Sequence, residues 1–124
     1  MAVGVSEKRV DAYEKVTGRA KYTDDLAEKN MLVAKVFRST IANGVVKSID
    51  TSEAEKIPGV VKIITCFDVP QYKFPTAGHP WSTDPAHQDV ADRLLLTSRV
   101  RYYGDDVAAV IAEDEVAANR AIRA

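Results

Sequence analysis

The chain has 124 residues, 46% hydrophobic and 28% charged, a balance typical of one folded globular domain and not of a disordered segment. Its 17 basic and 18 acidic residues give a formal net charge of -1 with no block of one sign, which argues against nucleic acid and anionic lipid as partners. The single cysteine excludes an intrachain disulfide and a Cys-x-x-Cys metal site, and a reducing, cytoplasmic setting fits this composition best.

Residues 1–25 are expected to form an N-terminal arm and a turn. Within them, Asp11–Val16 is predicted to form a short helix that ends at Gly18, because glycine tolerates the left-handed conformation that ends helices. The first ten residues lack the continuous apolar stretch of a signal peptide. Apolar runs such as Val107–Ala112 are far shorter than the roughly 20 residues that span a bilayer, so we expect no membrane contact.

Three strands are predicted in the first half of the domain. Met31–Phe37 is rich in strand-favouring residues and is expected to be well buried, with one face formed by Leu32, Ala34 and Val36. The turn Asn43-Gly44 leads into a second strand, Val45–Asp50, and Val60–Cys66 alternates as a third.

A short helix is predicted between the second and third strands. Ser52 is expected to cap it with Glu55 in a capping box, and Pro58-Gly59 to end it. The link is shorter than the dozen or so residues usual for a parallel crossover, which leaves parallel pairing of the two strands open.

The segment 70–92 is predicted to be a long proline-rich loop, and such loops are usually functional or act as linkers. Beyond it, Leu94–Val100 is expected to form a short strand and the continuous apolar run Val107–Ala112 the middle of the sheet. Asp114 is predicted to cap a final helix through Arg123, whose small inward side chains would allow close packing on the sheet.

Chemical motifs are sparse in this sequence. The six glycines are too far apart for a dinucleotide-binding or P-loop fingerprint, and neither Gly-x-Ser-x-Gly nor His-Glu-x-x-His is present. His79 and His87, with Asp84 and Asp89 nearby, have the ligand chemistry of a metal site. The favoured alternative is that His79, Trp81 and His87 form a partner-docking loop in which the indole supplies a large amphipathic surface.

The other polar candidates have ordinary structural explanations. The pairs Asp24-Asp25 and Asp105-Asp106 are interpreted as turn and cap residues, since nothing nearby would raise a carboxyl pKa. Arg99 and Arg101 would share one side of an extended segment, where they could hold a carboxylate or phosphate or form surface ion pairs. Cys66 is expected to be a buried small hydrophobe. We therefore expect no catalytic, cofactor-binding or metal-binding residue on this chain.

Four blocks in the same order over nearly the whole chain resemble the opening domain of the xanthine dehydrogenase and aldehyde oxidase family. They are Lys15–Asp25, Arg38–Gly44, Ser48–Ala54 continuing through Ile57–Val60, and Tyr103–Val110. The loop with Gly78–Trp81 and Gln88-Asp89 is similar to that of the bacterial molybdenum subunits. Two positions depart from the family pattern: Asn43 stands where histidine is common, and the chain ends at Ala124, before the strand that normally follows the last helix.

The resemblance implies an α/β (α+β) hammerhead fold over residues 1–124, with a mixed β-sheet and a few short helices, at the N-terminus of a molybdenum-binding large subunit. Such an oxidoreductase hydroxylates purines, related heterocycles or aldehydes with water as the oxygen source. The molybdenum (molybdopterin) cofactor and the catalytic residues would lie in downstream domains, with iron–sulfur and FAD groups on partner domains or subunits. The isolated domain, interpreted as an expressed fragment or split gene product, would be inactive. The alternatives are a large-subunit fragment of aldehyde oxidase or carbon monoxide dehydrogenase type, and a free-standing interaction module.

Overall fold

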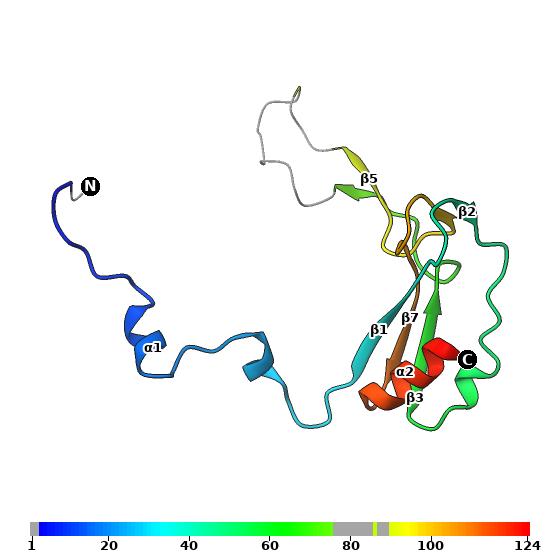
Figure 1. The fold of residues 1–124 in the computed structure, drawn as a ribbon, viewed down its shortest axis with the longest axis horizontal. Coiled ribbons are helices and arrows are strands. Elements are labelled where there is room, and N and C mark those ends of the chain that lie inside the picture. Colours follow the sequence, from blue (N-terminus) through cyan, green and yellow to red (C-terminus); the bar gives the residue numbers. More distant parts are fainter. Residues whose placement is uncertain (1–2, 76–85, 87–89) are drawn as a thin grey trace. The chain divides into compact units, whose positions relative to one another are not determined.

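The computed structural model describes residues 3–75, 86 and 90–124. The chain divides into two units, one that ends at Met31 and one that runs from Leu32 to Ala124 (Figure 1).

The N-terminal unit contains two short helical turns. The helix α1 (Ala12–Val16) ends as predicted at Thr17 and Gly18, where Gly18 has a φ of +70°. The 3₁₀ turn η1 (Thr23–Leu26) begins with a hydrogen bond of 2.9 Å from the Tyr22 backbone N–H to the Asp25 carboxylate. Asp25 therefore stabilises a turn, in keeping with the structural interpretation of Asp24-Asp25.

The second unit is built on a three-stranded sheet with the order β1-β7-β3. The middle strand is β7 (Asp106–Ala112), and the outer strands are β1 (Val33–Arg38) and β3 (Val60–Thr65). The continuous apolar run around Val107–Ala112 thus lies in the middle of the sheet, as predicted. Two small ladders join β2 (Gly44–Val45) to β6 (Arg99–Val100) and β4 (Phe74–Pro75) to β5 (Ala91–Arg93).

The α/β class is confirmed, but the strand directions differ from the expected mixed sheet. Every strand pair in the described part of the chain is antiparallel. The physical reason is that the second predicted strand does not join the main sheet, so the two strands expected to be parallel candidates are not neighbours, and β3 pairs with β7. The strand β2 is also much shorter than the predicted Val45–Asp50 and pairs with β6, not with β3.

The helix α2 (Glu115–Arg123) covers one face of the sheet (Figure 1). Asp114 caps it as predicted, because its Oδ1 accepts a hydrogen bond of 2.7 Å from the Ala117 backbone N–H. The small side chains of the helix face inward and lie in one buried cluster with residues of β7 and of the 3₁₀ turn η2 (Ala54–Lys56): Ala54, Val110, Ala112, Ala117, Ala118 and Ala121.

A second buried cluster lies at the other end of β7. It contains Cys66, Leu96, Val100 and Val107, and the partly buried side chain of Ile64 packs against it. Cys66 is 3% exposed, as expected of a small buried hydrophobe.

Two local predictions between Asp50 and Cys66 were wrong. Ser52 does not cap a helix: its backbone N–H donates to the Asp50 carboxylate at 3.0 Å, and Glu55 accepts from the Thr51 hydroxyl at 2.7 Å. The regular alternation of β3 is also interrupted, since Val60 pairs with Ala112 while Lys62 pairs with Ile111. Val61 is the extra residue of a β-bulge, which places Val60 and Ile63 together in the core under α2.

Candidate interaction surfaces

The face of the sheet opposite α2 is apolar and only partly covered. Residues directly opposite each other in an antiparallel ladder have side chains on the same face, so the register pairs Ala34 with Ile111, Val36 with Ala109, and Ala109 with Ile64. We call these five residues the open face. Val36 is 40% exposed and Ala34 is exposed, while the other three are half-buried.

The open face contradicts the predicted burial of β1. Leu32, Ala34 and Val36 were expected to be inside, but in the described structure Leu32 is 47% exposed and it is Val33, on the alternate face, that packs against the core. The reason is that α2 covers only one face of the sheet, and the second buried cluster covers only the end of the other face near Val107.

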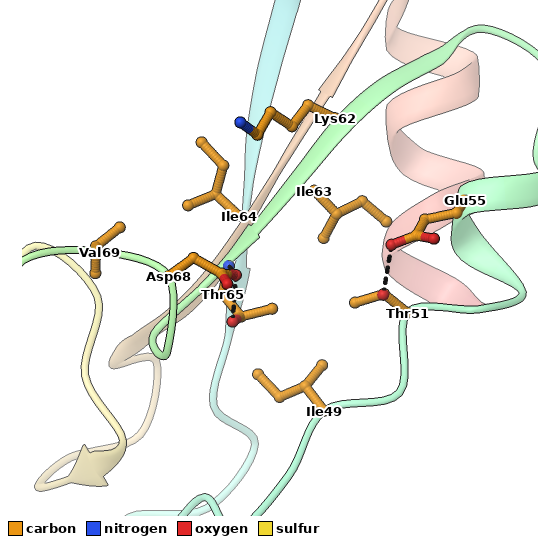
Figure 2. Close-up of a pocket in the computed structure, with 9 residues that line it drawn as sticks. All are labelled: Ile49, Thr51, Glu55, Lys62, Ile63, Ile64, Thr65, Asp68 and Val69. Carbon is orange, nitrogen blue, oxygen red and sulfur yellow. Dashed lines mark hydrogen bonds between the residues drawn. The ribbon is translucent and has the colours of Figure 1, made fainter.

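A groove of about 540 Å³ runs beside β3 (Figure 2). At one end, the backbone N–H and hydroxyl of Thr65 donate to the Asp68 carboxylate at 2.8 and 2.6 Å, and at the other end Thr51 donates to Glu55. The lining combines these polar pairs with aliphatic side chains: Ile49, Thr51, Glu55, Lys62, Ile63, Ile64, Thr65, Asp68 and Val69.

The carboxylates near the groove are held in the charged form. Hydrogen bonds from the Thr65 side chain and backbone lower the pKa of Asp68 below its usual range, and those from Ser52 lower the pKa of Asp50. Such carboxylates are poor general bases, because their basicity is already satisfied by fixed donors. The groove therefore has the character of a docking surface, not of an acid–base site. Sequence reasoning missed it, since no local pattern links residues 49–55 with residues 62–69.

The two arginines singled out in the sequence both line a small pocket of about 200 Å³. The Arg101 guanidinium donates to the Asp92 carboxylate at 3.4 Å and to the backbone carbonyl oxygen of Asp92 at 2.9 Å. Arg101 therefore forms a surface ion pair, which was one of the two expectations. Asp105 is buried and accepts from the Arg101 backbone N–H at 3.0 Å, while Arg99 lines the same pocket. The arrangement fixes the turn before β7.

Potential metal ligands do not cluster in the part of the chain that the structure describes. Among residues 3–75, 86 and 90–124, no three His, Cys, Asp or Glu side chains come together as metal ligands. Burial raises the pKa of the Cys66 thiol, which disfavours the thiolate that binds metals. In the same part of the chain, no helix is long and apolar enough to cross a membrane. His79, Trp81 and His87 lie outside the described residues, so the partner-docking loop stays a prediction.

Residues 17–124 match a family described as aldehyde oxidase and xanthine dehydrogenase, a/b hammerhead domain. The chain is 52% identical over 113 residues to the putative xanthine dehydrogenase molybdenum-binding subunit XdhA of Escherichia coli (strain K12). The matched region covers 91% of this chain and 15% of that protein. It is 32% identical over 121 residues to the probable hypoxanthine oxidase XdhD of the same organism, which covers 98% of this chain and 12% of that protein. The chain thus spans only 15% and 12% of the length of these two curated relatives.

Solved structures of the same kind share the fold. The aldehyde oxidoreductase from Desulfovibrio desulfuricans ATCC 27774 superposes with a TM-score of 0.75 at 35% identity, over 96% of this chain and 13% of that one. The Cu,Mo-CO dehydrogenase superposes with a TM-score of 0.72 at 32% identity, over 97% of this chain and 14% of that one.

Proposed function

The chain belongs to the aldehyde oxidase and xanthine dehydrogenase a/b hammerhead family, and from this we propose that it is a non-catalytic domain of a molybdenum-binding large subunit. The observation that carries the proposal is the 52% identity over 113 residues to the E. coli subunit named as a xanthine dehydrogenase molybdenum-binding subunit. Identity to the large chain of carbon monoxide dehydrogenase from Afipia carboxidovorans is 32%. This difference favours a xanthine dehydrogenase-type parent, whose substrates would be purines or related heterocycles hydroxylated with oxygen from water.

The proposed role of the domain is to brace the parts of the subunit that hold the cofactor. The described residues gather no cluster of metal ligands, and we derive no catalytic step on this chain. The molybdenum cofactor would be held elsewhere in the subunit, with FAD and iron–sulfur clusters on partner domains or subunits in the cytoplasm. The open face and the groove beside β3 are the surfaces that such contacts would use.

A domain-exchange experiment tests the proposal. The matched segment of the E. coli subunit is replaced by this chain, and the chimera is expressed with the partner subunits of the E. coli enzyme. We expect a soluble chimera that contains molybdenum and hydroxylates xanthine, because both chains would present the same surfaces to the rest of the subunit.

The isolated 124-residue chain is the control. We expect it to purify without molybdenum and without xanthine turnover, measured by metal analysis and by urate absorbance. Stoichiometric molybdenum or turnover in the isolated chain would refute a non-catalytic role, and a chimera that never assembles would refute membership in a subunit of this type.

A further inference from the structure

The open face breaks the pattern of an antiparallel sheet that has one face in water. Such a sheet normally alternates apolar residues toward the core with polar residues toward solvent. The outward positions of β7 between its ends are Ala109 and Ile111, and β1 places Ala34 and Val36 beside them, so these four neighbouring positions are all apolar. The outward charge on β1 is Arg38 at its end, which forms an ion pair of 3.1 Å with Asp106. A strand that is apolar on both faces needs a second covering layer, because an apolar sheet face must be buried against another element.

Within the unit Leu32–Ala124, the described residues leave that layer incomplete. The cluster of Cys66, Leu96, Val100 and Val107 covers the sheet only where β7 begins. Toward the other end, Val36 is 40% exposed, and Leu32, which precedes β1, is 47% exposed. Lys62 pairs with Ile111, which puts the ammonium group at the rim of the same face.

We propose that the open face docks against the remainder of the molybdenum-binding subunit, through an apolar surface that carries a carboxylate opposite Lys62. This inference rests on the proposed function. The matched segment makes up 15% of the E. coli subunit, so the other 85% of that chain lies outside it and is available to supply the covering layer.

The size of the face favours a tethered occupant over a second copy of this chain. With strands about 4.8 Å apart and a rise of about 3.3 Å per residue, the uncovered part of the three strands amounts to roughly 200 Å². A stable complex between separate proteins buries about 800 Å² on each partner. A domain of the same polypeptide needs much less contact area, because the covalent link supplies an effective concentration of about millimolar.

The test places a charge on the open face of the chimera. Val36→Glu puts a carboxylate into the proposed interface, and Val116→Glu is the matched control, since Val116 is 58% exposed on α2. We expect Val36→Glu to lower the yield of assembled, molybdenum-loaded chimera at least tenfold and Val116→Glu to leave it unchanged. In the isolated chain, both variants should keep the urea midpoint of the parent.

A milder substitution guards against a folding defect. If Val36→Glu unfolds the isolated chain, Val36→Thr replaces it, because threonine has a similar shape and strand preference. A partial loss of assembly at an unchanged urea midpoint would again support docking.

The remaining outcomes overturn the inference. If the parent chimera assembles and the Val36 variants behave like Val116→Glu, the open face is not the docking surface, although the proposed function stands. If sedimentation shows an isolated chain that dimerises and that Val36→Glu makes monomeric, the occupant is a second copy. If the parent chimera itself does not assemble, the proposed function fails, and this inference fails with it.

Discussion

Replacement of Gly59 by alanine tests how closely α2 packs on the start of β3. Gly59 has a φ of +89°, and a Cβ atom added there would lie 3.0 Å from the Cβ of Ala117. Its carbonyl oxygen accepts a hydrogen bond of 2.8 Å from the Glu113 backbone N–H, so the backbone cannot move away from the helix without losing that bond.

Two separate costs add up at this position. The left-handed conformation costs a residue with a Cβ about 1–2 kcal/mol. Crowding against Ala117 adds about 1 kcal/mol, the low end of the range for overpacked sites, since a contact of 3.0 Å is relieved by a shift of a few tenths of an ångström. We therefore expect Gly59→Ala to lower the free energy of unfolding by about 2–3 kcal/mol.

Gly104→Ala is the matched control, because Gly104 has a φ of +90° and nothing within 4 Å of an added Cβ. Gly104→Ala should lower the free energy of unfolding only by the cost of the left-handed backbone, about 1–2 kcal/mol. Urea unfolding of both variants, followed by circular dichroism at neutral pH, measures the difference. Equal losses would refute the close helix–sheet contact, and a loss in neither variant would refute the left-handed backbone at both positions. Ala117→Gly removes the Cβ atom that the new side chain at position 59 would crowd. In the Gly59→Ala background it should therefore restore the stability lost to crowding, seen as a favourable coupling energy in the double-mutant cycle.

Three further outcomes follow from the same contacts. Asp114→Ala should lower the free energy of unfolding by about 1 kcal/mol, since it removes the acceptor for the Ala117 N–H. Asp114→Asn keeps an acceptor oxygen and should retain most of the stability of the parent. Equal urea midpoints for the two variants would contradict the cap. The lowered pKa of Asp68 means that its hydrogen bonds from Thr65 stabilise the fold above the ordinary pKa of 3.8 and are lost as the pH falls through the lower folded value. The difference in free energy of unfolding between the parent and Asp68→Asn should therefore become smaller in acid. A difference that is constant with pH would contradict the stabilising role of the ionised Asp68 carboxylate. Cys66 should react with Ellman's reagent only after unfolding, because it is 3% exposed and burial raises the pKa of its thiol; rapid labelling of the native chain would contradict this.

The sequence pattern was sufficient to predict two elements that are determined by residues close together in the chain. The unbroken apolar run of β7 predicted the middle strand, and Asp114 before a run of small residues predicted the cap and the buried side of α2. Both depend on interactions within a few residues of the chain.

The connection before β3 depends on partners that local patterns do not reveal. A serine followed three residues later by a glutamate fits a capping box, but the Asp50 carboxylate binds the Ser52 N–H and the chain turns differently. The bulge at Val61 is a property of the pairing with β7, and the period-2 pattern of Val60–Cys66 contains no sign of it. The groove beside β3 follows from these two features, so it could not be predicted either.

The error at β1 has a different origin. The apolar set Leu32, Ala34 and Val36 was predicted to be buried, and the pattern rule behind that prediction is the one that succeeded for β7. A rule that works for one strand of a sheet and fails for its neighbour indicates that the burial of the neighbour depends on something besides the described residues of Leu32–Ala124. The exposed residues of β1 lie beside Ala109 and Ile111 on the same face, so the excess of apolar residues is shared by two strands. Exposed strands are normally protected by charge, but here the charges lie at the margins of the face, Lys62 on β3 and the Arg38–Asp106 ion pair at the end of β1, so selection for solubility in isolation is a poor explanation of the apolar centre. The covering layer proposed above, contributed by the rest of the subunit, would account for both the pattern and the exposure.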